Sequence, residues 1–339
     1  MITTTEQLEE ILSRPSQHDV EALGRLDGNL LILGAAGKMG PSLATRAKRA
    51  FDQASLANHV IAVSRFGDAA ARKSLEDAGI QTISADLMDR AALQRLPDAP
   101  YVIFMAGRKF GTQGAQHETW AANVLLPSMA AERYRDSRIV VFSSGNVYPF
   151  RKLKEGGAWE EIETDPVGEY AQTVRGRERM FEYFAEHFGT RSVLLRLNYA
   201  VEMRYGVLAD IARKVYDGQP VDVSMGSVNV IWQGDANSVA LRSFPLCSAP
   251  PAVLNLTGPE TLSVRLLAKS FGRLFGMDPV FQGTEGETAL LNDAHKCYDM
   301  FGPPSVGVAQ VIEWLAAWIQ RGGASLGKPT HFEATDGRY

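Results

Sequence analysis

Cysteine is scarce in this sequence: only Cys247 and Cys297 occur among its 339 residues. The two stand far apart and neither belongs to a CxxC pair, so we expect two reduced, structural thiols and no disulfide framework. Histidine offers no metal site either, because His117 has no partner histidine at the spacing that metal ligands require. We therefore expect no bound metal.

Long apolar runs and an excess of positive charge are missing as well. No apolar run approaches the roughly 20 residues that a membrane-spanning helix needs. The formal net charge of −4 gives no basic footprint for nucleic acid. Glu6, Glu9 and Glu10 make the N-terminal stretch unlike a secretory or transit signal. We expect a cytoplasmic protein that binds small molecules and has neither a nucleic acid nor a membrane as its partner.

What the sequence does contain is a glycine-rich turn between an apolar strand and a helix. Residues 30–40 read LLILGAAGKMG. Gly34 allows a sharp turn, Gly37 lets the backbone approach a pyrophosphate, and Gly40 lets the helix pack closely on the sheet. Glycines alone are a weak signal, because turns collect them for steric reasons. The flanking strand and helix favour a dinucleotide site. The other loop residues expected at the cofactor are Ala36, Lys38 and Met39.

Short apolar runs alternate with longer helical segments through the first 200 residues. The predicted strands are 30–33, 59–63, 80–84, 101–105 and 138–142, and the predicted helices are 38–51, 68–78, 119–133 and 170–187. This alternation is typical of right-handed βαβ units. It predicts an α/β fold with a doubly wound parallel Rossmann sheet.

The predicted organisation is an N-terminal helical arm at 1–28, a dinucleotide-binding domain at 29–200 and a smaller mixed α/β substrate-binding region at 201–339. Residues 228–245 are expected to return to the first domain. The second region has predicted strands at 228–232 and 252–256, and predicted helices at 207–216, 236–244, 264–275 and 308–319. No flexible linker separates the halves, so the second should pack on the first and cover its ligand crevice.

The end of the second strand bears on the choice of cofactor. An acidic residue there would bind the adenosine ribose of NAD, whereas an arginine accommodates the extra phosphate of NADP. This chain has Ser64 and Arg65 and no acid. Arg65 favours NADP over NAD, although a solvated surface arginine is the alternative.

Two further stretches carry a family resemblance, Phe142 to Pro149 (FSSGNVYP) and Gly168 to Glu178 (GEYAQTVRGRE). With the glycine turn they resemble the extended short-chain dehydrogenase/reductases, the group of NAD-dependent epimerases and dehydratases. Matching positions elsewhere are Asp86-Leu87, Ala106-Gly107, Asn123-Val124 and Arg196-Leu197-Asn198. The resemblance implies that Asp86 and Leu87 contact adenine. It implies that Ala106 and Gly107 line the ribose and nicotinamide, and that Asn198 and Tyr199 belong to the segment holding the carboxamide end.

The same resemblance implies a catalytic pair. Ser144 would hydrogen-bond the reacting oxygen of the substrate, and Tyr170 would act as general acid/base. Hydride transfer from a carbinol carbon must be matched by removal of the hydroxyl proton, so one positioned group is needed there. Without the resemblance both residues are commonplace.

The family pattern fails four residues after the tyrosine, where a lysine normally holds the nicotinamide ribose and lowers the tyrosine pKa. This chain has Val174. A lysine ammonium about 5 Å from a phenolate would contribute roughly 3 kcal/mol at an effective dielectric near 20. Arg175 should point away from Tyr170, and Arg177 is a long reach along the helix, so we expect Arg177 to be a surface or subunit-contact residue. The oxidised nicotinamide would then be the cation at the phenol.

Substrate contacts are less specific. Arg108 and Lys109 follow the fourth strand at the edge where doubly wound folds bind ligands, and could pair with a carboxylate or phosphate. Arg204 could do the same. The helices near 119–133 and 170–187 carry apolar residues through which family members commonly dimerise, so a homodimer is expected. The same residues could equally be intramolecular core.

Three hypotheses remain open. The first is an NAD(P)-dependent oxidoreductase of the epimerase/dehydratase type, acting on a sugar, sugar acid or nucleotide sugar through Ser144 and Tyr170. The second is a regulatory or scaffolding protein that binds the dinucleotide without turnover, which Val174 suggests. In the third, the chain is an active enzyme whose acid/base group is not Tyr170.

Overall fold

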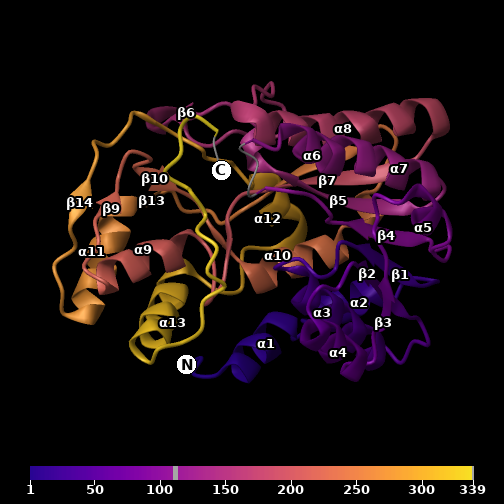
Figure 1. Ribbon diagram of the computed structural model, residues 1–339, viewed down its shortest axis with the longest axis horizontal. Coiled ribbons are helices and arrows are strands. Elements are labelled where there is room, and N and C mark those ends of the chain that lie inside the picture. The colour runs from indigo at the N-terminus through magenta and orange to yellow at the C-terminus, as the bar shows by residue number, and fades with distance from the viewer. Residues whose placement is uncertain (110–113, 338–339) are drawn as a thin grey trace.

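The structure, a computed structural model, describes residues 1–109 and 114–337, and within them a sheet of seven parallel strands forms the centre. Its strand order is β12-β7-β5-β4-β1-β2-β3 (Figure 1). The strands are β1 (Leu30–Leu33), β2 (Val60–Ser64), β3 (Gln81–Ser84), β4 (Tyr101–Phe104), β5 (Arg138–Ser144), β7 (Arg191–Leu197) and β12 (Ala252–Leu256). The predicted doubly wound Rossmann sheet is confirmed.

Alternate residues of each strand enter two different cores. In β1, Leu30 and Ile32 pack with α2 (Gln17–Leu23), α3 (Gly40–Gln53), α4 (Ala69–Asp77) and α10 (Gln233–Arg242). Leu31 and Leu33 pack with α5 (Arg90–Gln94), α7 (Leu126–Arg133) and α8 (Gly168–Phe188) on the opposite face. All four leucine and isoleucine side chains are fully buried. A strand buried on both faces reads as a continuous apolar run, which is why residues 30–33 show no alternation.

A third core belongs to the second half of the chain and to the N-terminal arm. It is built from α9 (Val207–Tyr216), α11 (Val264–Phe275) and α13 (Val308–Gln320). The first helix, α1 (Thr5–Ser13), adds Leu8 and Leu12 to this core, while Glu10 on the same helix pairs with Arg49 of α3. The arm therefore joins the two halves of the molecule.

The prediction of one continuous strand at 228–232 is wrong. The stretch is broken into β10 (Ser227–Val228), which pairs antiparallel with β13 (Leu262–Ser263), and β11 (Ile231–Trp232), which pairs parallel with β8 (Ala200–Val201). Short apolar runs do not reveal which strand they pair with. The remaining short elements are β6 (Arg151–Lys152), β9 (Val221–Asp222), β14 (Phe281–Gln282), β15 (Thr288–Ala289), α6 (Gln116–Trp120), the π-helical turn Ala121–Leu125 and α12 (His295–Phe301).

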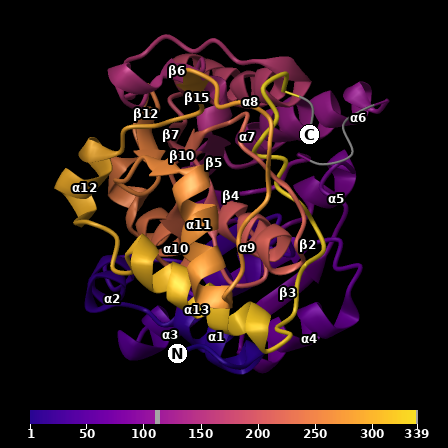
Figure 2. The same cartoon turned by 90° about the vertical axis from the view of Figure 1, so that its left-hand side faces the viewer.

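Several segments of the second half return to the first. Helix α10 packs on α2 and α3, and β12 forms an edge of the central sheet. The C-terminal tail runs from α13 back across the molecule (Figure 2), and Gly337 lies directly against Gly168 at the start of α8. Among the described residues, none of the helices combines the length and apolarity needed to cross a membrane.

Asp19 ties three of these helices together. Its carboxylate is fully buried and accepts hydrogen bonds from Nε and Nη2 of Arg46 on α3, at 2.9 and 2.7 Å. It also accepts from the backbone amide of Ser16 at 2.7 Å and from the hydroxyl of Ser238 on α10. The arm, the first Rossmann helix and a helix from the second half therefore meet at one carboxylate.

Replacing Asp19 with alanine should lower the free energy of unfolding by about 3–5 kcal/mol, because the buried Arg46 guanidinium would lose its charge partner. Urea unfolding followed by circular dichroism measures this. Glu21→Ala, on the exposed side of the same helix, is the control and should change stability by no more than about 0.5 kcal/mol. Equal midpoints for the two variants would contradict the role assigned to Asp19.

Candidate active site

A cavity of about 520 Å³ lies at the carboxyl ends of the central strands. Ligands of doubly wound folds bind at this edge of the sheet. The residues that line it are Ala36, Gly37, Lys38, Met39, Met105, Gly107, Lys109, Phe142, Ser143, Ser144, Asn146, Tyr170, Leu197, Asn198, Tyr199, Ala200, Tyr205, Gly206, Gln233, Lys328 and Thr330. The glycine turn, the Ser144 strand end and the Tyr170 helix therefore meet in one cavity, and the C-terminal tail contributes to its wall.

The three glycines of the turn have different surroundings. Gly34 has a φ of +92°, and a Cβ there would lie 2.6 Å from the Ala106 amide nitrogen. A Cβ on Gly40 would lie 2.1 Å from the Ala35 carbonyl oxygen. A Cβ on Gly37 would meet only the Gly34 carbonyl oxygen, at 3.4 Å. The fold itself thus requires the first and third glycines, whereas the second is exposed and leaves room for a ligand to approach the backbone.

Ser144 and Tyr170 lie within hydrogen-bonding distance of each other. Ser144 ends β5, and its hydroxyl both donates to Oδ1 of Asn146 and accepts from the Asn146 amide. Tyr170 lies in the first turn of α8 and shares a hydrogen bond with Ser144. Burial raises the pKa of Tyr170, while the charge of Arg177 and the Ser144 hydrogen bond lower it. Two groups that could hold one substrate oxygen therefore face the same cavity.

Arg177 is not the surface residue that its position on the helix suggested. Its side chain is 6% exposed. Nη1 donates to the Phe142 carbonyl oxygen at 2.6 Å, and Nη2 donates to Oδ1 of Asn123 at 2.9 Å. A Cβ on Gly107 would lie 2.3 Å from Nη2. The guanidinium therefore lies beneath Gly107, on the side of α8 that carries Tyr170, and an arginine side chain does span two turns back along the helix.

Val174 has a packing role instead of an electrostatic one. It is fully buried with Val147, Tyr148 and Ala158, and the Tyr170 ring packs against this small cluster. Arg175 points elsewhere, as expected, and donates to Thr164, Glu178 and Glu182. On α8, the cation whose charge lowers the Tyr170 pKa thus comes from seven residues along the helix and not from four.

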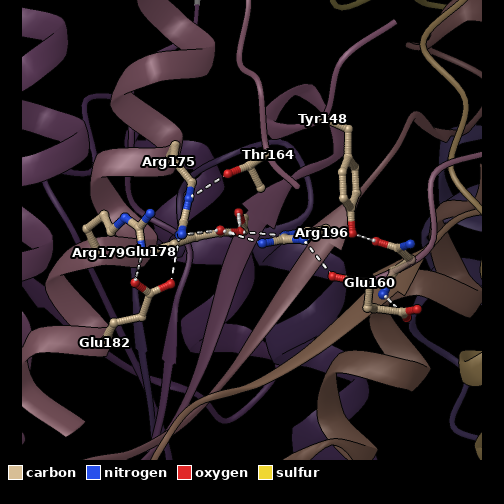
Figure 3. Close-up of polar contacts among 10 residues, drawn as sticks. Tyr148, Glu160, Thr164, Arg175, Glu178, Arg179, Glu182 and Arg196 are labelled. Carbon is tan, nitrogen blue, oxygen red and sulfur yellow. Dashed lines mark hydrogen bonds and ion pairs between the residues drawn. The ribbon is translucent and has the colours of Figure 1, made fainter. Parts of the chain in front are cut away.

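A buried polar network holds α8 against the sheet (Figure 3). Nε and Nη2 of Arg196 on β7 donate to the two oxygens of Glu178, both at 2.9 Å. The Ser143 hydroxyl donates to the same carboxylate at 2.6 Å, and Arg196 also donates to the Tyr148 hydroxyl at 2.7 Å. The Tyr148 hydroxyl in turn donates to Oδ1 of Asn255 on β12. The network fixes α8 relative to the strand end that carries Ser144.

Two lysines lie among aromatic rings in the cavity. Nζ of Lys109 is 5.6 Å from the ring centroid of Tyr170 and 5.7 Å from that of Tyr199. Nζ of Lys38 is 3.2 Å from the ring centroid of Tyr205. Burial lowers the pKa of Lys109 to about 8, and burial with repulsion from other lysines lowers that of Lys38 to about 7. Lys109, expected from sequence as a substrate contact, lies in the cavity.

Other sequence-predicted positions lie outside the cavity lining. Ser64 ends β2, and Arg65 and Asp86 follow β2 and β3 at the same edge of the sheet, where both are exposed. Leu87 belongs to the core, and the Ala106 backbone packs on Gly34. These assignments to the adenine, ribose and phosphate stay predictions, as does the preference of Arg65 for NADP. Comparing dissociation constants for NADH and NADPH decides that preference.

Arg108 and Arg204 do not line the cavity. The backbone of Arg108 is clamped by the Asn123 side chain, with both hydrogen bonds at 2.8 Å. The guanidinium of Arg204 pairs with Glu202 and, at 2.6 Å, with Glu9 of the N-terminal arm. Arg204 thus fastens the arm, and neither guanidinium is proposed to contact the substrate. Among residues 1–109 and 114–337, no cluster of three or more histidine, cysteine or acidic side chains is placed to hold a metal.

Sequence reasoning missed the cavity residues contributed by the second half. These are Tyr205, Gly206, Gln233, Lys328 and Thr330. The Lys328-Pro329-Thr330 turn is visible in the sequence but has no pattern that links it to the glycine turn. Only the path of the tail brings it there.

The fold and the cavity are those of the Rossmann oxidoreductases: a glycine turn, a serine and a tyrosine lie together at the carboxyl edge of a parallel sheet. A model of the NAD dependent epimerase/dehydratase family matches residues 30–235. The chain belongs to this family, and a nicotinamide dinucleotide is its expected cofactor. No curated protein sequence matches the chain.

Solved structures with the same fold include sugar-nucleotide epimerases. UDP-glucose 4-epimerase from Thermotoga maritima superposes with a TM-score of 0.71 at 16% identity, over 87% of this chain and 99% of that one. UDP-glucuronic acid 4-epimerase from Bacillus cereus, solved with NAD, gives 0.71 at 16% over 86% and 99%. UDP-glucose 4-epimerase from Thermus thermophilus, also with NAD, gives 0.70 at 17% over 86% and 99%.

The glycine turn offers a matched pair of variants. Gly37→Ala should weaken NADH binding by about tenfold or more, or about 1.4 kcal/mol, with an almost unchanged melting temperature, because the added methyl group points at the expected pyrophosphate position. Gly40→Ala should lower the melting temperature by about 5 °C or more, because its methyl group meets the Ala35 carbonyl. NADH fluorescence titration and thermal melting measure the two effects. Undiminished NADH affinity in Gly37→Ala would count against the cradle.

Proposed function

We propose that this protein is an NAD(P)-dependent oxidoreductase of the epimerase/dehydratase type that acts on a sugar, sugar acid or nucleotide sugar. The observation that carries the proposal is the convergence of Ser144, Tyr170 and the glycine turn in one cavity, with the charge of the buried Arg177 acting on the Tyr170 phenol. Sugar-nucleotide epimerases among the structural neighbours support the substrate class. The carbohydrate itself is an inference from these relatives.

The glycine turn fits a dinucleotide. Gly37 leaves the backbone open, and Gly34 and Gly40 permit the tight turn. Ala36, Gly37, Lys38 and Met39 would hold the pyrophosphate, and Gly107, Asn198 and Tyr199 would lie at the nicotinamide end. Bound there, the nicotinamide supplies the hydride acceptor for the substrate carbinol carbon.

The chain's own residues handle the proton. Tyr170, as phenolate, would take the proton of the substrate hydroxyl. Ser144 would turn its hydroxyl proton from Asn146 Oδ1 to the same substrate oxygen and so hold that oxygen in place. Burial raises the pKa of Tyr170, which works against the phenolate, and the Arg177 charge offsets part of that rise. Arg177 therefore does the electrostatic part of the work that the family's lysine does.

Arg177 also bears on the non-catalytic alternative. Val174 is the reason to suspect a scaffolding or regulatory protein, because it removes the usual cation. A buried guanidinium that lowers the phenol pKa restores that function from another position. This favours an active enzyme that uses Tyr170 over both a binding module and an enzyme with a different base.

Arg177→Met should move the acid limb of the kcat/KM profile to higher pH by about one unit. The reason is that the phenol must lose its proton to act as base, and loss of a nearby positive charge raises its pKa. Arg177→Lys should restore part of the shift. Tyr170→Phe should lower kcat by about 10³-fold or more with NADH affinity retained.

Initial rates between pH 6 and 10 on a panel of aldoses, uronates and nucleotide sugars provide these profiles. Arg179→Met is the matched control, because Arg179 is exposed on the same helix and pairs with Glu182. Turnover that survives Tyr170→Phe would remove the tyrosine from the mechanism. An unchanged pH profile in Arg177→Met would show that Arg177 does not lower the Tyr170 pKa in the reaction. NADH binding without turnover of any substrate would favour the scaffolding alternative.

We also propose that the protein forms a homodimer. Met129 and Phe184 are intramolecular core, whereas Leu125, Tyr183 and Phe188 are 48–51% exposed on neighbouring helices. Exposed apolar side chains in one region are typical of an interface. Leu125→Glu should therefore weaken dimerisation at least about tenfold, measured by light scattering during gel filtration. Leu153→Glu, also at an exposed leucine but on a different surface, should have no effect, and a wild-type monomer would refute the proposal.

A further inference from the structure

Three lysines from three separate segments line the cavity. Lys38 belongs to the glycine turn, Lys109 follows β4, and Lys328 lies on the C-terminal tail, exposed at the cavity mouth. They are near enough that repulsion from Lys109 and Lys328 adds to burial in lowering the pKa of Lys38. Asp210 is the carboxylate whose charge opposes this effect at both Lys38 and Lys109. Positive charge gathered in a partly desolvated cavity favours a bound anion.

Lys109 lies beside the acid/base tyrosine. Its Nζ is almost equidistant from the Tyr170 and Tyr199 rings, at 5.6 and 5.7 Å from their centroids. An oxyanion in a hydrogen bond with this ammonium would therefore lie close to a hydroxyl held by Tyr170. The anionic group would thus be part of the reacting sugar itself.

The tail is fastened on both sides of Lys328. The Leu326 amide donates to the Arg204 carbonyl oxygen at 3.1 Å. The amide and hydroxyl of Thr330 both donate to Oδ2 of Asp210, at 2.7 and 2.6 Å. Lys328 therefore projects from a short stretch of backbone that is held at both ends, next to the cavity. A segment fixed in this way positions a charge at lower entropic cost than a free tail would.

Resting on the proposed function, we propose that the substrate is an acidic sugar, and that Lys109 and Lys328 bind its carboxylate or a phosphate attached directly to its ring. Both groups are planar or tetrahedral oxyanions that accept hydrogen bonds from an ammonium. Lys109 would orient the sugar beside Tyr170. Lys328 would close the mouth over the anion.

Lys38 differs from the other two lysines because the cofactor pyrophosphate is also expected to be its ligand. It lies in the glycine turn, where the cofactor pyrophosphate is expected, and over the Tyr205 ring. Loss of NADH affinity in Lys38→Met would assign that lysine to the cofactor. Lys328, which the tail contributes, is the cleaner probe of the substrate.

The test measures binding to the full-length protein saturated with NAD⁺, by calorimetry. The probes are matched pairs: D-glucuronate against D-glucuronamide, and glucose 1-phosphate against glucose. UDP-glucuronate against UDP-glucose extends the carboxylate pair to nucleotide sugars. The acid should bind at least tenfold more tightly than its neutral partner. This preference should fall to less than threefold in Lys328→Met and Lys109→Met, and Lys328→Arg should retain it.

Lys73→Met is the control, because Lys73 is exposed on α4 and pairs with Asp77. It should leave every preference unchanged. Whichever pair shows the larger preference identifies the carboxylate or the phosphate as the recognised group. Equal binding of acid and neutral partners, no binding of any probe, or a preference that survives both methionine variants would overturn the inference. NADH binding is measured in parallel: its absence removes the proposed function, whereas its presence without an acid preference removes only this inference.

Discussion

The buried ion pair between Glu178 and Arg196 determines where α8 lies on the central sheet. The Glu178 carboxylate also accepts the Ser143 hydroxyl, so one group connects the helix that carries Tyr170 with the strand end that carries Ser144. A buried pair of this kind adds little net stability, since desolvation of two charges offsets much of their attraction. Its value is positional. Any other rotation of α8 would leave a carboxylate buried without its partner, so Tyr170 and Arg177 are held in one orientation toward the cavity.

Arg177 shows how a cation can act on the Tyr170 phenol from a distant position on the same helix. Position 174 is occupied by a valine that packs beneath the tyrosine ring, which removes the nearest cation but keeps the ring in place. The guanidinium extends back along the helix because the Phe142 carbonyl and Oδ1 of Asn123 accept hydrogen bonds from it. Gly107 has no Cβ that would occupy the same space. Sequence spacing gives only the distance along the helix. It does not reveal that Phe142 and Asn123 supply acceptors or that Gly107 leaves space for the guanidinium. That is why the sequence argument placed Arg177 at the surface.

The fold was largely predictable, for identifiable reasons. The strand at 30–33 is apolar throughout because both of its faces are covered, α4 begins after the capping Asp68, and α8 ends at Gly189. The break between β10 and β11 was not predictable, since each half pairs with a different distant strand. The same holds for α1, which was predicted as part of a helical arm but whose burial in the third core depends on helices about 200 residues or more further along the chain.

The sequence by itself determined the glycine turn, because local geometry there requires glycine, and its family resemblance pointed to Ser144 and Tyr170. Tertiary structure decided which charges surround them. Lys109 and Lys328 reach the cavity on a strand-end loop and on a tail that is tied down by Asp210, and helix packing buries Arg177 beneath Gly107. Electrostatic interactions act through space between segments that are distant in the chain, so the charge environment of the site follows from packing and cannot be obtained from spacing.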